Sequence, residues 1–292
     1  MNSLNGETLL TGLIANPARH SLSPLMWNTS FQEKNMNYAY LTFEVEEGKL
    51  TEAVRGVRAL GIRGVNVSMP FKQRVIPLLD DLSPQAKLVG AVNTIVNQGG
   101  TGRLVGHMTD GIGCFKALAA QGFSAKNKIV TIAGIGGSGK AVAVQAAMEG
   151  VAEIRLFNRN SSNYDKVIDL SDKIKKQFQI KVVVDYLENK TAFKDAIRTS
   201  HFYIDATSLG MRPLDNYSLI NDPEILTPNL VVVDLVYKPK ETALLRFVRQ
   251  NGVKHAYNGL GMLIYQGAEA FQLITNQEMP ISSVERVLQT EN

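Results

Sequence analysis

The chain has 292 residues, of which 45% are hydrophobic and 20% charged, values that are typical of a folded globular protein and exclude a disordered or fibrous one. Its length allows two ordinary domains, each with its own core. The net charge is +4, and the chain has one dense basic run, at 173–176. We interpret this run as the solvated face of a helix, so we expect no nucleic-acid partner.

The cysteines, histidines and apolar runs exclude further classes of protein. Cys114 is the single cysteine, which rules out an internal disulfide, and the four histidines are scattered, so we expect no metal site. No apolar segment reaches the length of a membrane span. We therefore expect a cytoplasmic protein with no membrane association.

In the first part of the chain, strand patterns alternate with segments of helical spacing. Expected strands cover 8–16, 38–45, 61–68, 91–96 and 102–106, and expected helices cover 23–34 and 48–60 or begin at 69 and 83. Ser23 is the expected N-cap of the first helix, with Pro24 in its first turn. The alternation predicts βαβ units and a largely parallel sheet.

The second part shows the same alternation, and a helix from Asp110 to about residue 122 leads into it. Expected strands cover 128–133, 153–157, 181–184, 202–205 and 230–234, and expected helices cover 141–148, 168–178, 192–198 and 241–251. Two further helices are expected at 259–275 and 282–290. The predicted fold class is α/β.

A glycine-rich turn connects the strand at 128–133 with the helix that follows. Gly134, Gly136 and Gly139 fit the pattern G-x-G-x-x-G in the strand–turn–helix context that dinucleotide binding requires. The first glycine permits a tight turn, the second lets the backbone approach a pyrophosphate, and the third lets helix and strand pack closely. The alternative is a plain turn. The context favours a dinucleotide site.

The first part also carries polar side chains that a core would not require. Ser21 and Ser23 can together bind one oxyanion on an extended backbone, although Ser23 alone is also a helix cap. Asn66 and Ser68 share one face at the carboxyl end of a strand, where ligands of α/β sheets bind. Asn93 enters another expected strand. These positions predict a site for a small polar ligand.

A lysine and an aspartate are the candidate reactive groups. Lys72 falls in the first turn of an expected helix, where a cation is unfavourable and needs either solvation or a carboxylate partner. Asp110 opens another expected helix, either as a cap or as such a partner.

The motifs as a set resemble those of the shikimate dehydrogenase family, closest to its quinate/shikimate dehydrogenase branch. In chain order they are Ser-x-Ser-Pro at 21–24, Asn-Val-Ser-x-Pro-x-Lys at 66–72, Gly-Ala-Val-Asn-Thr at 90–94, Thr-Asp-Gly-x-Gly at 109–113, the glycine turn, Asn-Arg at 158–159, Ala-Thr-Ser-Leu-Gly-Met at 206–211, Asp-x-x-Tyr at 234–237 and Gly-Met-Leu-x-x-Gln at 261–266. The resemblance covers nearly the whole chain.

The resemblance implies roles for individual residues. It implies that Lys72 and Asp110 are the catalytic pair. The implied substrate-binding residues are Ser21, Ser23, Tyr40, Asn66, Ser68, Lys72, Asn93, Asp110 and Gln266. The implied cofactor-binding residues are Gly134, Gly136, Gly137, Ser138, Gly139, Asn158, Arg159, Thr207, Tyr237 and Gly259.

The resemblance also implies a domain plan and an activity. A substrate-binding catalytic domain over 1–110 and a Rossmann-type, doubly wound parallel-sheet cofactor domain over 111–258 flank a cleft, and helices over 259–292 return to the first domain. The implied activity is NAD(P)-dependent oxidation of shikimate to 3-dehydroshikimate, with quinate as a further substrate. The alternatives are a non-catalytic sensor of these cyclic polyhydroxy acids and a folate-type or aminoacyl-type dehydrogenase. A homodimer is the assembly that we consider.

The chain departs from the family pattern at two places near the substrate. Met108 stands where the family usually has Asn, and Ser68 stands where many members have Thr. Near the cofactor, members devoted to NADP usually follow the Arg with Thr and a second basic residue, whereas Arg159 is followed by Asn160 and then Asn163. We therefore expect NAD to be used and preferred, with NADP tolerated.

Overall fold

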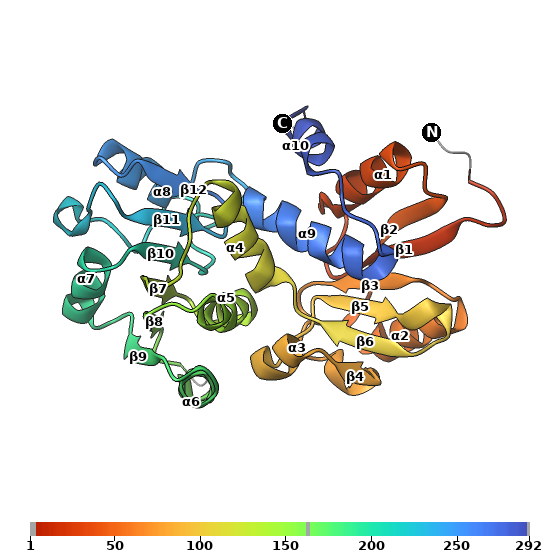
Figure 1. Ribbon diagram of the computed structural model, residues 1–292, viewed down its shortest axis with the longest axis horizontal. Coiled ribbons are helices and arrows are strands. Elements are labelled where there is room, and N and C mark those ends of the chain that lie inside the picture. The colour runs from red at the N-terminus through yellow and green to blue at the C-terminus, as the bar shows by residue number, and fades with distance from the viewer. Residues whose placement is uncertain (1–3, 162–163, 291–292) are drawn as a thin grey trace. The chain divides into compact units, whose positions relative to one another are not determined.

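The computed structural model describes residues 4–161 and 164–290. The chain forms two compact units (Figure 1). Unit 1 consists of the residues up to Gly113 and those from Ile264 onward, and unit 2 consists of Cys114–Leu263. The predicted α/β class is confirmed, since each unit contains a six-stranded sheet with helices packed on it. No helix within the described residues is both long and apolar enough to cross a membrane.

The sheet of unit 1 has the strand order β2-β1-β3-β5-β6-β4. Its strands are β1 Leu9–Ala15, β2 Tyr38–Glu44, β3 Gly64–Val67, β4 Asp81–Leu82, β5 Thr94–Asn97 and β6 Leu104–His107. The pairs of β1 with β2 and β3 are parallel, but β5 runs antiparallel to both of its neighbours. The expected largely parallel sheet is therefore a mixed one, because β5 and β6 follow each other through a short turn rather than through a crossover helix.

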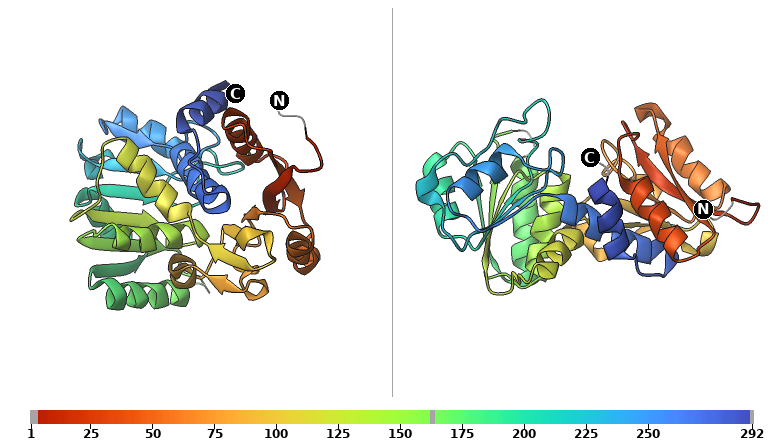
Figure 2. Two further views of the ribbon diagram at one scale, coloured as in Figure 1. Left: turned by 45° about the vertical axis from the view of Figure 1, so that its right-hand side comes forward. Right: turned by 90° about the horizontal axis from the view of Figure 1, so that it is seen from above.

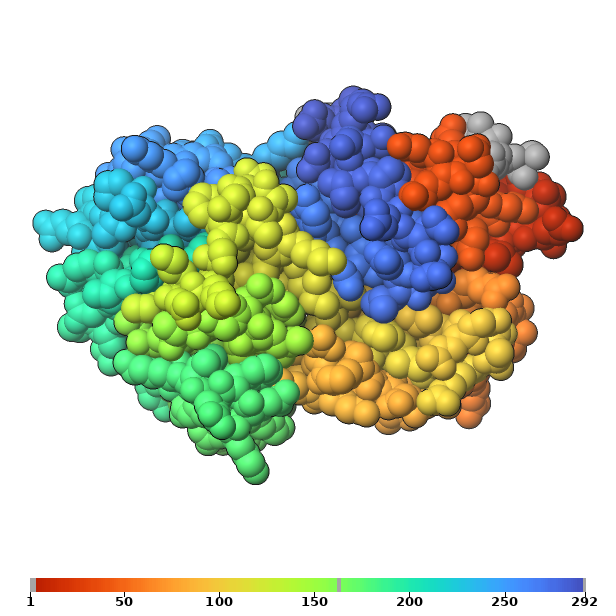
Figure 3. Space-filling model, viewed as in Figure 1, coloured from red at the N-terminus to blue at the C-terminus, as the bar shows by residue number. Residues whose placement is uncertain are grey.

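The helices of unit 1 are α1 Ser23–Glu33, α2 Leu50–Ala59, α3 Pro84–Val89, the part of α9 from Ile264 onward, and α10 Ile281–Thr290. In α2 the buried side chains are Leu50, Val54 and Val57, which is the spacing of an amphipathic helix. On the surface of this unit α10 lies beside α1 (Figure 3).

Aromatic packing holds α9 against the first helix and the edge of the sheet. Phe271 on α9 packs on Trp27 and Phe31 of α1, with ring centroids 5.1 and 5.4 Å apart. Trp27 in turn packs on Tyr40 of β2, at 4.8 Å. All four side chains are at most 2% exposed. A helix from the end of the chain is therefore part of the core of unit 1, and this packing fixes the position of the polar residues that the helix carries.

Two local expectations about helix starts are wrong. The N-cap of α1 is Leu22, and Ser23 is the first helical residue, because the Ser21 hydroxyl accepts the Ser23 amide at 3.2 Å instead. No helix begins at Met69: turns cover 69–75 apart from Phe71, and the 3₁₀ helix Ile76–Leu78 follows. Phe71 is fully buried, and anchoring it in the core holds the segment in turns. Lys72 therefore stands in a turn rather than in the first turn of a helix.

Unit 2 is built on a fully parallel sheet with the order β12-β11-β10-β7-β8-β9. Its strands are β7 Ile129–Ala133, β8 Glu153–Asn158, β9 Lys181–Tyr186, β10 Phe202–Asp205, β11 Val231–Asp234 and β12 His255–Tyr257. Numbered within the unit, this is the order 3-2-1-4-5-6 of a doubly wound dinucleotide-binding sheet. The expected Rossmann-type topology is confirmed, and the short β12 is a strand that the sequence pattern did not predict.

Helices cover both faces of this sheet (Figure 2). The α-helices that lie wholly within the unit are α5 Gly137–Met148, α6 Tyr164–Phe178, α7 Lys190–Arg198 and α8 Ala243–Gln250. α7 and α8 share one apolar cluster with the sheet residues Tyr203 and Val232, while α5 packs against α6. The apolar positions Leu244, Leu245 and Val248 of α8 are buried, which explains why this segment forms an amphipathic helix.

Two helices cross the boundary between the units. α4 Asp110–Ala120 and α9 Leu260–Thr275 each begin in one unit and continue into the other. The sequence places the boundaries at 110/111 and 258/259, whereas the compact units meet at 113/114 and 263/264. The first turn of α4 and most of α9 therefore belong structurally to unit 1, together with Asp110 and Gln266.

Candidate active site and cofactor cavity

Lys72 and Asp110 form an ion pair in unit 1. The Lys72 Nζ lies 2.6 Å from the Asp110 Oδ2, and the two side chains are 19% and 6% exposed. The two residues are 38 positions apart in the sequence, and they meet because the turn after β3 and the start of α4 lie close together in the folded unit. Of the two alternatives that the sequence leaves open for Lys72, solvation or a carboxylate partner, the structure shows the second, with Asp110 as the partner. A partly exposed ammonium on a buried carboxylate suits a group that exchanges protons.

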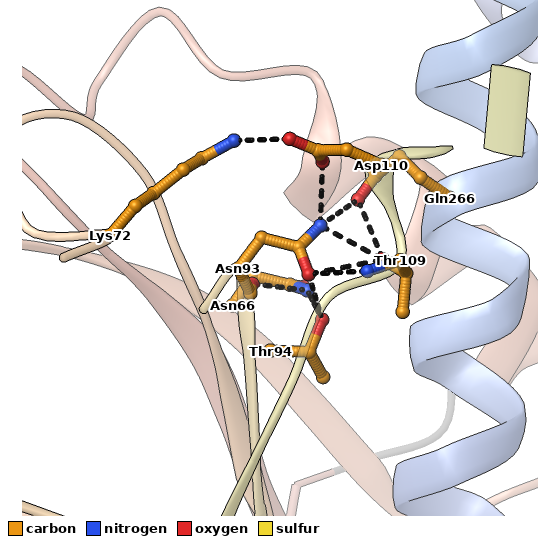
Figure 4. A network of polar contacts seen from close by, with 7 residues as sticks. All are labelled: Asn66, Lys72, Asn93, Thr94, Thr109, Asp110 and Gln266. Carbon is orange, nitrogen blue, oxygen red and sulfur yellow. Dashed lines mark hydrogen bonds and ion pairs between the residues drawn. The ribbon is translucent and has the colours of Figure 1, made fainter. Parts of the chain in front are cut away.

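Asn93 is the centre of a polar network around this pair (Figure 4). Its Nδ2 lies 2.6 Å from the Asp110 Oδ1, 2.8 Å from the Thr109 Oγ1 and 3.2 Å from the Gln266 Oε1. Its Oδ1 accepts the Thr109 amide at 2.8 Å. Each oxygen of the Asp110 carboxylate thus has its own donor, Lys72 or Asn93. This arrangement fixes the orientation of the carboxylate.

A second branch of the network runs across the strands of the sheet through Asn66. The Tyr40 hydroxyl donates to the Asn66 Oδ1 at 2.8 Å, and the Asn66 Nδ2 donates to the Thr94 Oγ1 at 3.1 Å. Burial raises the pKa of Tyr40 well above its usual range, while a hydrogen bond with Ser23 opposes this shift. Tyr40 is therefore a neutral donor at physiological pH. Asn66 on β3 and Asn93, which directly precedes the neighbouring β5, are thus linked through Thr94.

Of the three predicted serines, only Ser23 is found to contact the network in the described part of the chain. Ser23 is 8% exposed and its hydroxyl contacts Tyr40. Ser21 and Ser68 are only half-buried; the Ser21 hydroxyl accepts the Ser23 amide, and no bond from either side chain to the network is found within the described residues. The structure brings together Lys72, Asp110, Asn93, Gln266, Asn66, Tyr40 and Ser23, and leaves Ser21 and Ser68 as half-exposed polar groups.

Two threonines that were not among the predicted site residues also belong to the network. Thr94 is fully buried and Thr109 is 1% exposed, and both bind Asn93 side-chain atoms. A threonine directly before a helix-opening aspartate was the available signal for Thr109. The neighbouring Met108 is 3% exposed, and Asn93 supplies the hydrogen bonds that hold this segment.

The carboxyl edge of the unit 2 sheet carries a cavity of about 470 Å³. It lies over the loops after β7, β8, β9 and β10, where strand order reverses between β7 and β10, the position at which sheets of this kind bind ligands. Five of the predicted cofactor residues line it: Gly134, Gly136, Asn158, Arg159 and Thr207. The other lining residues are Ile135, Ser161, Leu187, Glu188, Lys190, Ala206, Ser208, Leu209, Leu214 and Leu219.

The glycine turn is shaped as the motif requires. Gly134 has a φ of +83°, a backbone conformation that glycine adopts without strain. A Cβ on Gly139 would collide with the Gly134 carbonyl oxygen, whereas a Cβ on Gly136 would meet no atom within 4 Å. Gly139 therefore permits the close packing of α5 on the turn. Gly136 leaves open space beside the backbone, at the N-terminus of α5.

The remaining predicted cofactor residues do not line the cavity. Gly137 and Ser138 are the first residues of α5. Gly259 packs against the backbone of Leu235, where a Cβ would collide. Tyr237 stands after β11, and burial raises the pKa of its hydroxyl.

A buried pair of carboxylates lies beneath the cavity. Asp205 and Asp234 end the neighbouring strands β10 and β11 in register and are 2% and 1% exposed. Asp205 accepts the amide and hydroxyl of Thr207 at 2.9 and 2.6 Å, so it positions a residue of the cavity. Burial raises the pKa of Asp205 and raises that of Asp234 to about 7. The acid at the end of each apolar strand was the sequence signal for this pair.

Comparison with known proteins identifies the family. The model of the shikimate dehydrogenase substrate binding domain matches residues 13–95, and that of the shikimate 5'-dehydrogenase C-terminal domain matches 259–289. A protein of Streptococcus pyogenes serotype M28 named shikimate dehydrogenase (NADP(+)) is 58% identical over 99% of both chains. The chain belongs to the shikimate dehydrogenase family.

Solved structures agree with this membership. Shikimate 5-dehydrogenase from Listeria monocytogenes, in complex with shikimate and NAD, is 42% identical over 99% of both chains, with a TM-score of 0.93. Quinate dehydrogenase from Corynebacterium glutamicum, in complex with NAD, is 29% identical over 97% of this chain and 99% of its own, with a TM-score of 0.86. The name of the streptococcal relative specifies NADP, which weighs against the preference for NAD expected from Asn160; Asn163, used in the same argument, lies outside the described residues.

Proposed function

We propose that this chain catalyses the reversible oxidation of shikimate to 3-dehydroshikimate with NADP as the preferred cofactor. The observation that carries the proposal is the partly buried Lys72–Asp110 pair, with 2.6 Å between Nζ and Oδ2 and with the Asn93 amide donating to the other carboxylate oxygen. The names of the streptococcal and listerial relatives support the substrate, and the streptococcal name supports NADP.

In the proposed mechanism, Lys72 in its neutral amine form takes the proton of the reacting hydroxyl during oxidation and becomes the ammonium, and the ammonium returns that proton during reduction. Its partial exposure of 19% gives the proton a route to solvent. Asp110 holds the ammonium in place and accepts from a neighbouring substrate hydroxyl. The geometry suits these two roles, because Asn93 donates to the other oxygen of the Asp110 carboxylate while Lys72 keeps conformational freedom.

The polar groups around the pair would bind the acid substrate. Asn66 and Gln266 offer amide groups to ring hydroxyls, and the neutral Tyr40 hydroxyl holds Asn66 in one orientation. Ser21 and Ser23 stand at the start of α1, where hydroxyl and amide donors suit a carboxylate. We expect these serines to bind the substrate carboxylate.

The cavity of unit 2 fits a dinucleotide. The glycine turn leaves open space at Gly136 and close packing at Gly139, which is the cradle that a pyrophosphate needs. Gly134, Gly136, Asn158, Arg159 and Thr207 would hold the cofactor. When bound, the nicotinamide ring accepts or donates the hydride.

Quinate is proposed as a slower second substrate. The structural similarity to the quinate dehydrogenase of Corynebacterium glutamicum favours this, as does the small Ser68 side chain. The alternative of a non-catalytic sensor gains no support from the relatives' names, and the Lys72–Asp110 pair is complete.

The test is a set of initial rates for shikimate and quinate, each with NADP⁺ and NAD⁺. We expect the highest kcat/KM for shikimate with NADP⁺. The absence of oxidation of either acid with both cofactors would refute the proposed activity, and a higher kcat/KM with NAD⁺ would refute the cofactor preference.

A further inference from the structure

Three charged residues line one part of the unit 2 cavity. Arg159 follows β8, while Glu188 and Lys190 follow β9. They come from successive βα connections, so their proximity depends on β8 and β9 being neighbours in the sheet. The loop after the second strand of such a sheet is where the adenosine ribose is recognised. This part of the cavity therefore decides how a 2′-hydroxyl or a 2′-phosphate is accommodated.

The two cations of this set are available for a ligand. Within residues 4–161 and 164–290, neither Arg159 nor Lys190 has a carboxylate within ion-pair distance. Further along the same helix, Lys194 pairs with Asp222 at 2.6 Å and Arg198 pairs with Asp195 at 2.5 Å. Lys190 thus differs from the other basic residues of α7, Lys194 and Arg198, because it lines the cavity and has no carboxylate partner among the described residues.

The carboxylate of the set is held in place by the backbone. The Glu188 Oε2 accepts a hydrogen bond at 3.3 Å from the backbone amide of Asn160, which is the residue directly after Arg159. The Lys190 amide donates to the Glu188 carbonyl at 2.9 Å, and Asn189 caps α7 by accepting the Ala192 amide at 3.2 Å. The position of Lys190 at the start of α7 is therefore set by a closed turn, and Glu188 spans the two loops.

We propose that Lys190 is the second cation that binds a 2′-phosphate, with Arg159 as the first, and that Glu188 weakens this binding. The inference rests on the proposed function of the chain as an NADP-binding dehydrogenase and names the residues that set its cofactor specificity. A phosphate monoester carries a charge of about −1.5 to −2 at pH 7, so two cations match it and one nearby carboxylate opposes it. Asn160 provides no charge for this purpose, and Lys190 replaces the basic residue missing after Arg159.

Cofactor binding without turnover tests this assignment. The dissociation constants of NADP⁺ and NAD⁺ are measured by calorimetry, in the absence of the acid substrate, for wild type, Lys190→Gln, Glu188→Gln and the control Lys194→Gln. Lys194→Gln removes the same charge from the same helix outside the cavity. We expect Lys190→Gln to weaken NADP⁺ about tenfold, as for the loss of one charge-assisted contact, and to leave NAD⁺ within about twofold. Glu188→Gln should strengthen NADP⁺ about threefold.

Each result bears on one assignment. If Lys190→Gln weakens both cofactors equally, or no more than Lys194→Gln does, Lys190 does not bind the 2′-phosphate. If Glu188→Gln leaves NADP⁺ binding unchanged or weakens it, Glu188 does not oppose the phosphate. Failure of the proposed activity remains distinguishable, since it would appear as tight NADP⁺ binding without oxidation of shikimate.

Discussion

Replacing Asp110 by Asn tests the central ion pair most directly. The side chain keeps its shape but loses its charge and one acceptor oxygen. In the native structure one oxygen accepts from Lys72 and the other from Asn93, both at 2.6 Å. An amide has one acceptor oxygen and one donor group. In Asp110→Asn, either Lys72 or Asn93 therefore faces a donor instead of an acceptor.

The size of the effect follows from the distance and the burial. Two unit charges 2.6 Å apart attract each other by about 6 kcal/mol at an effective dielectric constant of about 20. Desolvation offsets much of this attraction, and removing one partner of a buried pair costs about 3–5 kcal/mol. Because the Lys72 side chain is 19% exposed and can turn towards water, we expect about 3 kcal/mol. Lost as transition-state stabilisation, this corresponds to at least about a 10²-fold decrease in kcat/KM.

The assay is steady-state oxidation of shikimate with NADP⁺, together with urea unfolding. Asp80→Asn is the matched control, since it removes an ion pair of the same length, Arg58–Asp80 at 2.6 Å, outside the polar network of Figure 4. We expect the control to keep kcat/KM within about threefold, as for an exposed pair. If Asp110→Asn stays within tenfold of wild type, the pair does not carry the chemistry.

Three further changes test other parts of the structure. Gly139→Ala places a Cβ against the Gly134 carbonyl oxygen; we expect a loss of about 1–3 kcal/mol in unfolding free energy and weaker NADP⁺ binding, and an unchanged Tm and Kd would contradict this. Ser68→Thr adds one methyl near the substrate, worth about 1–3 kcal/mol; kcat/KM should fall more for quinate than for shikimate, and an unchanged ratio would refute the size argument. Burial raises the pKa of Asp234 to about 7 in the folded protein, above its value of about 3.9 in the unfolded chain. The protonated carboxyl therefore stabilises the folded state fully below about pH 3.9, and this stabilisation is lost as the pH rises to about 7. From pH 5 to pH 8 the unfolding free energy of wild type should therefore fall by about 2–3 kcal/mol relative to Asp234→Asn, and a difference that does not depend on pH would exclude this origin.

Much of the fold can be predicted from local patterns. The strands β7 and β10 and the helix α4 lie where apolar runs, glycines and a helix-opening aspartate indicate them, because these signals act between residues close in sequence. The short β12 and the turn that carries Lys72 were missed. β12 has three residues, too few for a period to be detected, and the turn is held by the burial of Phe71 rather than by its own sequence pattern.

The glycine turn, the order of the polar motifs and the residue types of the site can be identified from the chain alone, since each depends on residues close in sequence. Which of these residues come into contact depends on the folding of distant segments onto one another. Asn93 and Gln266 are 173 positions apart, and Lys190 reaches the cavity of Arg159 only because β8 and β9 pair. Strand order and register set such distances, and an apolar pattern identifies a strand without specifying its neighbour in the sheet. For this reason the residues that follow Arg159 in the sequence, Asn160 and Asn163, gave no indication of Lys190, the proposed second cation, which lies on α7.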